Sequence, residues 1–157
     1  MSLNKIIIGF IVILLLFSGI IIYQIQKNPP PKSKVTINNQ TFSIEVATTS
    51  AQQQKGLSGR TSLPSDQGML FVFKTAERYP FWMKDMKFPL DMIFINNNKV
   101  VSIIQNVPIP KSGESLNSLP IYTPDAPANE VLEINAGLAK KYDFKKDDAV
   151  TVVPSIK

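Results

Sequence analysis

The chain has 157 residues, a length suited to one domain of ordinary size, and it contains neither cysteine nor histidine. These absences exclude disulfides, thiolate metal sites, a thiol nucleophile and a Ser-His-Asp triad, and they leave no group that predicts a metal or cofactor. The formal charge of +5 is uneven, because four lysines and no acids lie in the first 34 residues, and the other 13 basic and 12 acidic side chains nearly balance. The near-neutral remainder has no basic stripe with interleaved aromatic residues, so we expect no nucleic-acid partner.

Residues 6–25 form an uncharged apolar run, IIIGFIVILLLFSGIIIYQI, between a short tail (residues 1–5) and a Pro/Lys linker (residues 26–34). At about 1.5 Å per residue, a helix of about twenty residues spans about 30 Å, the thickness of a bilayer core. The run is longer than the apolar part of a usual signal peptide, and no small-residue cleavage site follows it. We therefore predict an uncleaved, single-pass anchor in the lipid bilayer of the cell membrane.

The charges beside this run bear on its orientation. Lys5 precedes the run, whereas Lys27, Lys32 and Lys34 follow it, so the positive-inside count slightly opposes an external C-terminus. An apolar run so near the N-terminus behaves as a signal-anchor, however, and long domains translocate regardless of nearby charge. We expect residues 35–157 to be extracytoplasmic and the flanking lysines to contact anionic headgroups.

Residues 35–157 are predicted to be a mainly β (α+β) domain with about eight strands and two short helices. In KVTINNQTFSIEVA, apolar and polar residues alternate on both sides of an Asn-rich turn, which predicts two strands. A helix is expected next, with Ser50 and Gln53 as a candidate capping box and Gly56 at its end. Further strands are predicted in MLFVF (69–73), PFWMK (80–84), LDMIFI (90–95), NNNKVVSIIQ (96–105), NEVLEIN (129–135) and DDAVTVV (147–153), and helical turns in AGLAKKYDF (136–144). This pattern favours a small, bent, barrel-like sheet over a layered α/β fold.

The connection 106–128 contains five prolines and little periodicity. A structureless connection of this length is typical of a binding loop, a lid or a mobile segment. The alternative is a surface loop that packs Ile121 and Tyr122 onto the core. Both interpretations stay open, and Tyr122 is a candidate binding residue.

Asp91 interrupts an apolar strand. Strand periodicity places it on one face with Ile93 and Ile95, opposite Leu90, Met92 and Phe94. An unpaired buried charge costs several kcal/mol, so a buried Asp91 needs a partner. We expect that partner to be Lys84, Lys87 or Arg60.

Trp82 and Lys84 point the same way in the predicted strand 80–84, opposite Phe81 and Met83. An indole beside a cation suits a sugar, carboxylate or peptide ligand. The structural alternative is that Trp82 fills the sheet while Lys84 pairs with Asp91.

Several segments in order, KGLSGRTSLPSDQGMLFVF, FWMKDMKFPLDMIFI, VVSI and VLEINAG, resemble the motifs of the domain-of-unknown-function family 192 (DUF192). The resemblance covers about residues 42–153. It implies a small β-rich domain of the kind found in exported or membrane-anchored prokaryotic proteins, and it implies no established activity. The polar positions of the motifs fall on Arg60, Trp82, Lys84, Asp91 and Glu133.

The chain departs from the family pattern in four places, the first of which is Ser58, where Met usually follows Gly-Leu. Asp85-Met86 stands where Asn-Thr is usual, and the segment 106–128 lacks the cysteines that many relatives carry. Asp143 and Asp147 occupy glycine positions, which puts the usual turn geometry there in question.

Three classes of function follow. The favoured hypothesis is a membrane-tethered binding module for a small molecule, glycan or peptide, with a cleft walled by Trp82 and the loop 106–128, and with Arg60 and Lys84 binding an anionic or carbonyl group beside Asp91. The second is a hydrolase that uses Asp91 and Glu133 as a carboxylate pair or Lys84 in a Ser–Lys dyad, although alternation in 129–135 turns Glu133 outward. The third is a structural or assembly partner in the cell envelope that binds through a sheet edge.

Overall fold

The computed structural model describes residues 10–11, 14–15, 18, 33–111 and 113–154, and the chain divides into one unit up to Pro31 and a second from Lys32. The described residues of the first unit are helical, and the Ser18 hydroxyl donates to the Leu15 carbonyl over 2.8 Å. Within the described part of the chain, no helix is both long and apolar enough to cross a membrane. Most of the predicted span 6–25 lies outside the described residues, so the anchor stays a prediction.

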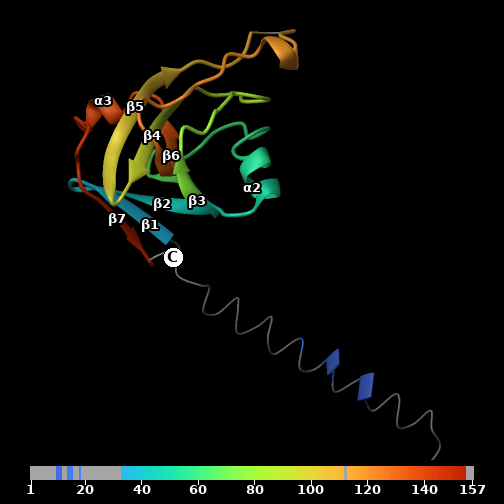
Figure 1. Ribbon diagram of the computed structural model, residues 1–157. Coiled ribbons are helices and arrows are strands. Elements are labelled where there is room, and N and C mark those ends of the chain that lie inside the picture. The colour runs from blue at the N-terminus through green and yellow to red at the C-terminus, as the bar shows by residue number, and fades with distance from the viewer. Residues whose placement is uncertain (1–9, 12–13, 16–17, 19–32, 112, 155–157) are drawn as a thin grey trace, which may run out of the picture. The chain divides into compact units, whose positions relative to one another are not determined.

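The second unit is built on a seven-stranded sheet with the strand order β5-β4-β6-β3-β2-β1-β7 (Figure 1). The strands are β1 (Ser33–Ile37), β2 (Gln40–Ala47), β3 (Gln67–Glu77), β4 (Leu90–Asn96), β5 (Lys99–Val107), β6 (Ala128–Asn135) and β7 (Val150–Val153). Neighbouring strands are antiparallel except β2 and β3, which are parallel. Lys99 of β5 also bridges to Ala149, just before β7. The sheet thus bends until its two edge strands meet at one end, which confirms the predicted bent, mainly β architecture as a half-barrel.

Tight turns form where short polar residues tolerate a left-handed backbone. The β1–β2 turn contains Asn38 (φ 53°), and the β4–β5 turn contains Asn97 (φ 50°) and Asn98 (φ 59°). Asp143 (φ 53°) and Asp147 (φ 73°) also have positive φ. Aspartate therefore keeps the left-handed backbone at the two positions that glycine holds in the family motif.

Two short α-helices and a 3₁₀ turn complete the unit: α2 (Ser50–Lys55), α3 (Leu138–Lys141) and η1 (Leu116–Ser118). The capping box of α2 is Thr49 with Gln52, one residue before the predicted pair. Gln53 instead donates from its side-chain amide to the Val72 carbonyl over 2.8 Å, which ties α2 to β3. Gly56 ends α2 with φ 46°, as predicted.

The sheet separates two apolar layers. The inner layer fills the bend of the sheet, and it is closed by Leu138, Ala139 and Phe144 in and after α3. The outer layer covers the other face of β3, β4 and β6 with residues around α2 and in the segment 79–88. In Figure 1, α2 and α3 accordingly lie on different sides of the sheet. The predicted division of the 90–95 strand is confirmed, because Ile93 and Ile95 belong to the inner layer and the three residues Leu90, Met92 and Phe94 to the outer one.

The prediction of a strand over 80–84 is wrong, and the described residues form seven strands rather than about eight. Phe81 makes one isolated bridge, in which the Phe81 amide donates to the Tyr122 carbonyl (2.9 Å) and the Tyr122 amide donates to the Phe81 carbonyl (2.8 Å). Pro80 and the positive φ of Asp85 (56°) interrupt regular pairing on either side. Buried and exposed side chains still alternate in this segment because it lies flat on the outer layer. Phe81 and Met83 are buried in that layer, and Trp82 between them is exposed.

Candidate functional site

Glu133 lies in the middle of the sheet and faces the outer layer. It pairs in register with Met69 of β3 and with Met92 of β4, and residues directly opposite each other share a face. Only 5% of its surface is exposed. The expectation that it turns outward to solvent is wrong, because β6 is a central strand and both of its faces are covered.

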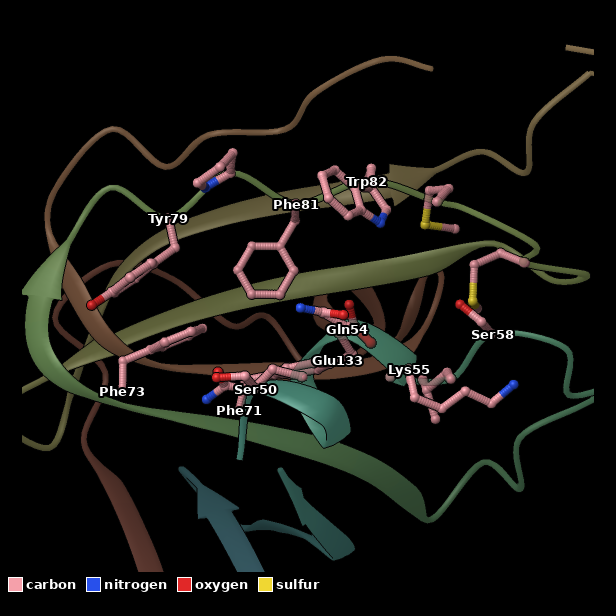
Figure 2. Close-up of a pocket in the computed structure, with 16 residues that line it drawn as sticks. Ser50, Gln54, Lys55, Ser58, Phe71, Phe73, Tyr79, Phe81, Trp82 and Glu133 are labelled. Atoms are coloured by element: carbon pink, nitrogen blue, oxygen red, sulfur yellow. The ribbon is translucent and has the colours of Figure 1, made fainter. Parts of the chain in front are cut away.

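A pocket of about 390 Å³ opens above Glu133, between α2 with the residues that follow it and the segment 79–86. We call it the Glu133 pocket; its aromatic walls are Phe71, Phe73, Tyr79, Phe81 and Trp82. In Figure 2, Phe81 and Trp82 come from the segment on one side, and Ser50, Gln54 and Lys55 come from α2 on the other. The pocket joins three parts of the chain that are distant in sequence.

The aromatic walls are held by contacts among themselves. The rings of Phe73 and Tyr79 stack with their centroids 3.8 Å apart, and Phe71 meets Phe81 edge to face at 5.3 Å. Trp82 is 49% exposed and forms part of the pocket's mouth. The walls are therefore largely preformed, and a flat apolar surface stays accessible at the entrance.

The carboxyl group of Glu133 is electrostatically isolated. Burial raises its pKa from the ordinary 4.5 to about 8, because the charged form loses its hydration. Among the described residues no donor or cation contacts it, and its oxygens open onto the pocket. Of the other residues that line the pocket, Lys55 and Tyr79 are the titratable ones. The carboxyl group is thus mostly protonated at neutral pH in the empty pocket.

Asp91 is fully buried on the opposite face of the sheet, and its expected pairing with a basic side chain is wrong. One carboxylate oxygen accepts from the Asn106 amide and the other from the Ala139 amide, both over 2.8 Å. These bonds tie β4 to the end of β5 and to α3. Asp91 aligns with Ile134, and not with Glu133, so the structure does not bring the two carboxylates into one site.

The basic candidates lie outside the Glu133 pocket. Arg60 forms a two-pronged ion pair with Glu45, at 2.5 and 2.7 Å, which raises the pKa of Arg60 and lowers that of Glu45. The carbonyl of Lys84 accepts from the Ser58 hydroxyl over 2.7 Å, and no described serine hydroxyl bonds to the Lys84 amine.

Tyr122 also lies outside the pocket. It packs half-buried against the outer layer through its bridge to Phe81, whereas Ile121 is 55% exposed. The connection 106–128 is therefore a surface loop held by Tyr122, and no described part of it lines the pocket. Of the six candidate residues, Trp82 and Glu133 reach the pocket.

Sequence reasoning missed the rings of Phe71, Phe73 and Tyr79 and the contribution of α2. A signal for the rings was present, because the segment 71–82 is dense in aromatic residues. Nothing local indicates that α2 faces this segment, since their contact depends on how the parallel β2–β3 connection crosses the sheet.

The sequence profile of DUF192, a domain of unknown function described as an uncharacterized ACR, matches residues 33–152. The chain belongs to the DUF192 family. The match begins at β1 and includes every strand of the sheet, so it confirms and extends the resemblance in the motifs. A comparison with curated proteins finds no match for this DUF192 chain.

Two solved structures have the same fold. A protein of unknown function from Novosphingobium aromaticivorans DSM 12444 is 33% identical and has a TM-score of 0.66. The match covers 76% of this chain and 83% of that protein's chain. A protein from Sinorhizobium meliloti 1021, described as a candidate transcription regulator, is 27% identical and has a TM-score of 0.68. The match covers 78% of this chain and 94% of that protein's chain. Each of the two structures matches about three quarters of this chain.

Proposed function

We propose that this DUF192 protein is a membrane-anchored, extracytoplasmic module that binds a small molecule in the Glu133 pocket. The observation that carries the proposal is a buried carboxyl group at the base of an aromatic pocket, which no described residue of the chain contacts as a donor or cation. Burying such a group is unfavourable unless something compensates it, so its persistence in a central strand favours a role in binding.

The size of the pocket favours a small molecule over a glycan or peptide. Its volume of about 390 Å³ lies near the lower end of the range of about 300–1,000 Å³ that is usual for small-molecule sites. Apolar walls with one deep polar group also match such sites, in which the polar group sets the orientation of the ligand.

Binding is also favoured over hydrolysis. A glycosidase-type mechanism needs two carboxyl groups on either side of the scissile bond. Asp91, the other buried carboxylate of the described residues, lies across the sheet, where two backbone amides already occupy it.

The binding proposal is tested on the full chain in detergent micelles with 2-phenylethanol as a neutral probe. Saturable shifts of backbone amide signals in α2, 79–86 and β6 are the expected result. Trp82→Ala should weaken binding at least about fivefold, because it removes a wall of about 150–250 Å². Ile121→Ala is the matched control, an exposed apolar residue outside the pocket, and should leave binding unchanged. If 2-phenylethanol and its charged analogues phenethylamine and 3-phenylpropionate all leave the pocket signals unchanged, this function is wrong.

The membrane orientation is tested by cysteine labelling, for which a cysteine-free chain is well suited. Ser115→Cys places a thiol at an exposed position of the domain, and Ser2→Cys places one before the apolar run. In intact cells a membrane-impermeant maleimide should label the first variant and reach the second only after lysis. The reverse pattern would put the domain in the cytoplasm.

A further inference from the structure

We infer that the ligand of the Glu133 pocket is an organic cation, whose ammonium group reaches the Glu133 carboxylate while its apolar body lies against the aromatic walls. This inference rests on the proposed function and names its ligand class. Three observations support it. They are the lack of a described positive charge beside Glu133, the position of Lys55 and the chemistry of the pocket walls.

The first step concerns the missing counter-charge. Glu133 is almost wholly buried, and among the described residues no cation or hydrogen-bond donor contacts it. Asp91 faces away, on the other side of the sheet. A carboxylate in this position gains most from a ligand that brings both a positive charge and N–H donors, because charge-assisted hydrogen bonds strengthen away from bulk water.

The second step concerns Lys55, the basic residue that lines the pocket among those the structure describes. Its ammonium group lies 3.6 Å from the position that a Cβ would take on Gly59. Figure 2 shows the Lys55 side chain extending away from Glu133, toward the rim. The protein's own cation is therefore directed elsewhere, and the space next to Glu133 is left for a ligand.

The third step concerns the walls. Five aromatic rings line the pocket, and the electron-rich faces of such rings attract ammonium groups within about 6 Å, most strongly for tryptophan. Met83 and Met86 add polarizable thioethers. Aromatic rings around an acid form a site that prefers a cation over an anion.

The competing occupant is a neutral hydrogen-bond acceptor held by the protonated acid. The two cases differ in pH dependence. A cation uses the ionised form of Glu133, so its affinity should rise by up to about tenfold per pH unit as the pH approaches the Glu133 pKa of about 8. A neutral acceptor uses the protonated form, and its affinity should fall over the same range. Lys55 on α2 and Tyr79 on the facing segment are the other titratable residues that line the pocket among those described.

The experiment compares three probes with the same phenylalkyl body on the full chain in detergent micelles: phenethylamine, 2-phenylethanol and 3-phenylpropionate. Amide shifts of the pocket residues are titrated at about pH 6 and about pH 8.5, where the amine keeps its proton. We expect phenethylamine to bind at least about tenfold tighter than the alcohol at the higher pH, and the propionate to bind most weakly. Glu133→Gln, which keeps the shape of the side chain, should abolish the preference for the amine and its pH dependence, whereas the control Ile121→Ala should keep both.

The outcomes separate this inference from the proposed function. If the alcohol binds as tightly as the amine, or the amine preference survives Glu133→Gln, the cation assignment is wrong although the pocket still binds. If no probe binds, the proposed function fails as well. N-acetyl-lysine amide, compared with its norleucine analogue, shows whether a lysine side chain of a peptide can supply the ammonium group in place of a free amine.

Discussion

At the scale of single residues, Glu133 and Asp91 show how position in a sheet decides the state of a carboxyl group. Both are buried in neighbouring central strands. Two backbone amides donate to Asp91, whereas no described donor reaches Glu133, which lines the pocket. Burial without donors favours the neutral form of a carboxyl group, which raises the pKa of Glu133. Asp91 thereby has a structural role, and a ligand-binding role is proposed for Glu133.

Glu133→Gln should stabilise the protein at alkaline pH. The folded pKa of Glu133 is about 8 against an ordinary 4.5, so the folded state holds its proton longer than the unfolded state. Stability due to this group is complete below the ordinary pKa and is lost as the pH rises to about 8, by up to about 1.4 kcal/mol per pH unit. The free energy of unfolding is measured by urea denaturation. Between about pH 5 and about pH 9 it should fall by a few kcal/mol more in the natural protein than in the variant.

Glu45→Gln is the contrasting control for this pH effect. Its ion pair with Arg60 lowers the pKa of Glu45, so the stability that it contributes is present above its ordinary pKa and lost as the pH falls. If the free energy of unfolding depends on pH in the same way in the natural protein and in Glu133→Gln, the conclusion that burial raises the pKa of Glu133 is wrong.

At the scale of elements, Asp91 joins three of them. Its two oxygens hold the amides of Asn106 at the end of β5 and of Ala139 in α3. Helix α3 has four residues and Gly137 at its N-cap, with no side-chain hydrogen bond there. A helix this short is not stable by itself, so its place depends on Asp91 and on the packing of Leu138 and Ala139.

Asp91→Ala should lower the free energy of unfolding by about 3 kcal/mol, because it leaves the buried Ala139 amide and the partly buried Asn106 amide without their acceptor. Urea denaturation followed by circular dichroism measures the loss. Asp66→Ala, at an exposed turn, is the control and should change stability by less than about 0.5 kcal/mol. Equal effects of the two substitutions would show that Asp91 does not join the elements.

Gly68→Ala should push β3 away from β6. A Cβ at Gly68 would lie 2.7 Å from the carbonyl oxygen of Glu133, which is closer than real Cβ contacts allow. We expect a loss of about 1–3 kcal/mol, with amide shifts across both strands and the pocket. Gly59→Ala is the control; its nearest contact would be 3.6 Å, so its cost is the left-handed strain of φ 80°, and its shifts should stay local.

At the scale of the whole molecule, the chain divides into two compact units, one up to Pro31 and one from Lys32. The β-rich unit from Lys32 onward contains the complete sheet, both apolar layers and the Glu133 pocket. The bend of the sheet makes this arrangement possible, because its inner face buries one layer while its outer face is left to be covered by α2 and the segment 79–88. The pocket forms where that cover is incomplete.

A fragment of residues 32–157 should fold without the first unit. Its thermal unfolding midpoint should match that of the full chain in micelles within a few degrees, since no element of the sheet is lost. After cell lysis and sedimentation, the full chain should appear with the membranes and the fragment in the supernatant. A full chain that stays in the supernatant would contradict the proposed anchor.

Much of the fold was predictable because its determinants are local. Alternation located the strands around Asn38-Asn39 and Asn97-Asn98, and it assigned the two faces of the 90–95 strand correctly. The same logic failed at 80–84, where a loop lying on an apolar layer alternates like a strand. It also failed for Glu133, since alternation distinguishes two faces but does not show that both are buried.

By itself, the sequence determined the chemistry available to this protein: no thiol, no imidazole, a near-neutral β-rich domain after an apolar run, and the ordered motifs of DUF192. Only the tertiary structure decided which residues share a site. It separated Asp91, Arg60, Lys84 and Tyr122 from Trp82 and Glu133, and it brought α2 to the pocket. The physical reason is that side-chain direction along a strand depends on near neighbours, whereas strand order and the covering of each face depend on contacts between distant segments.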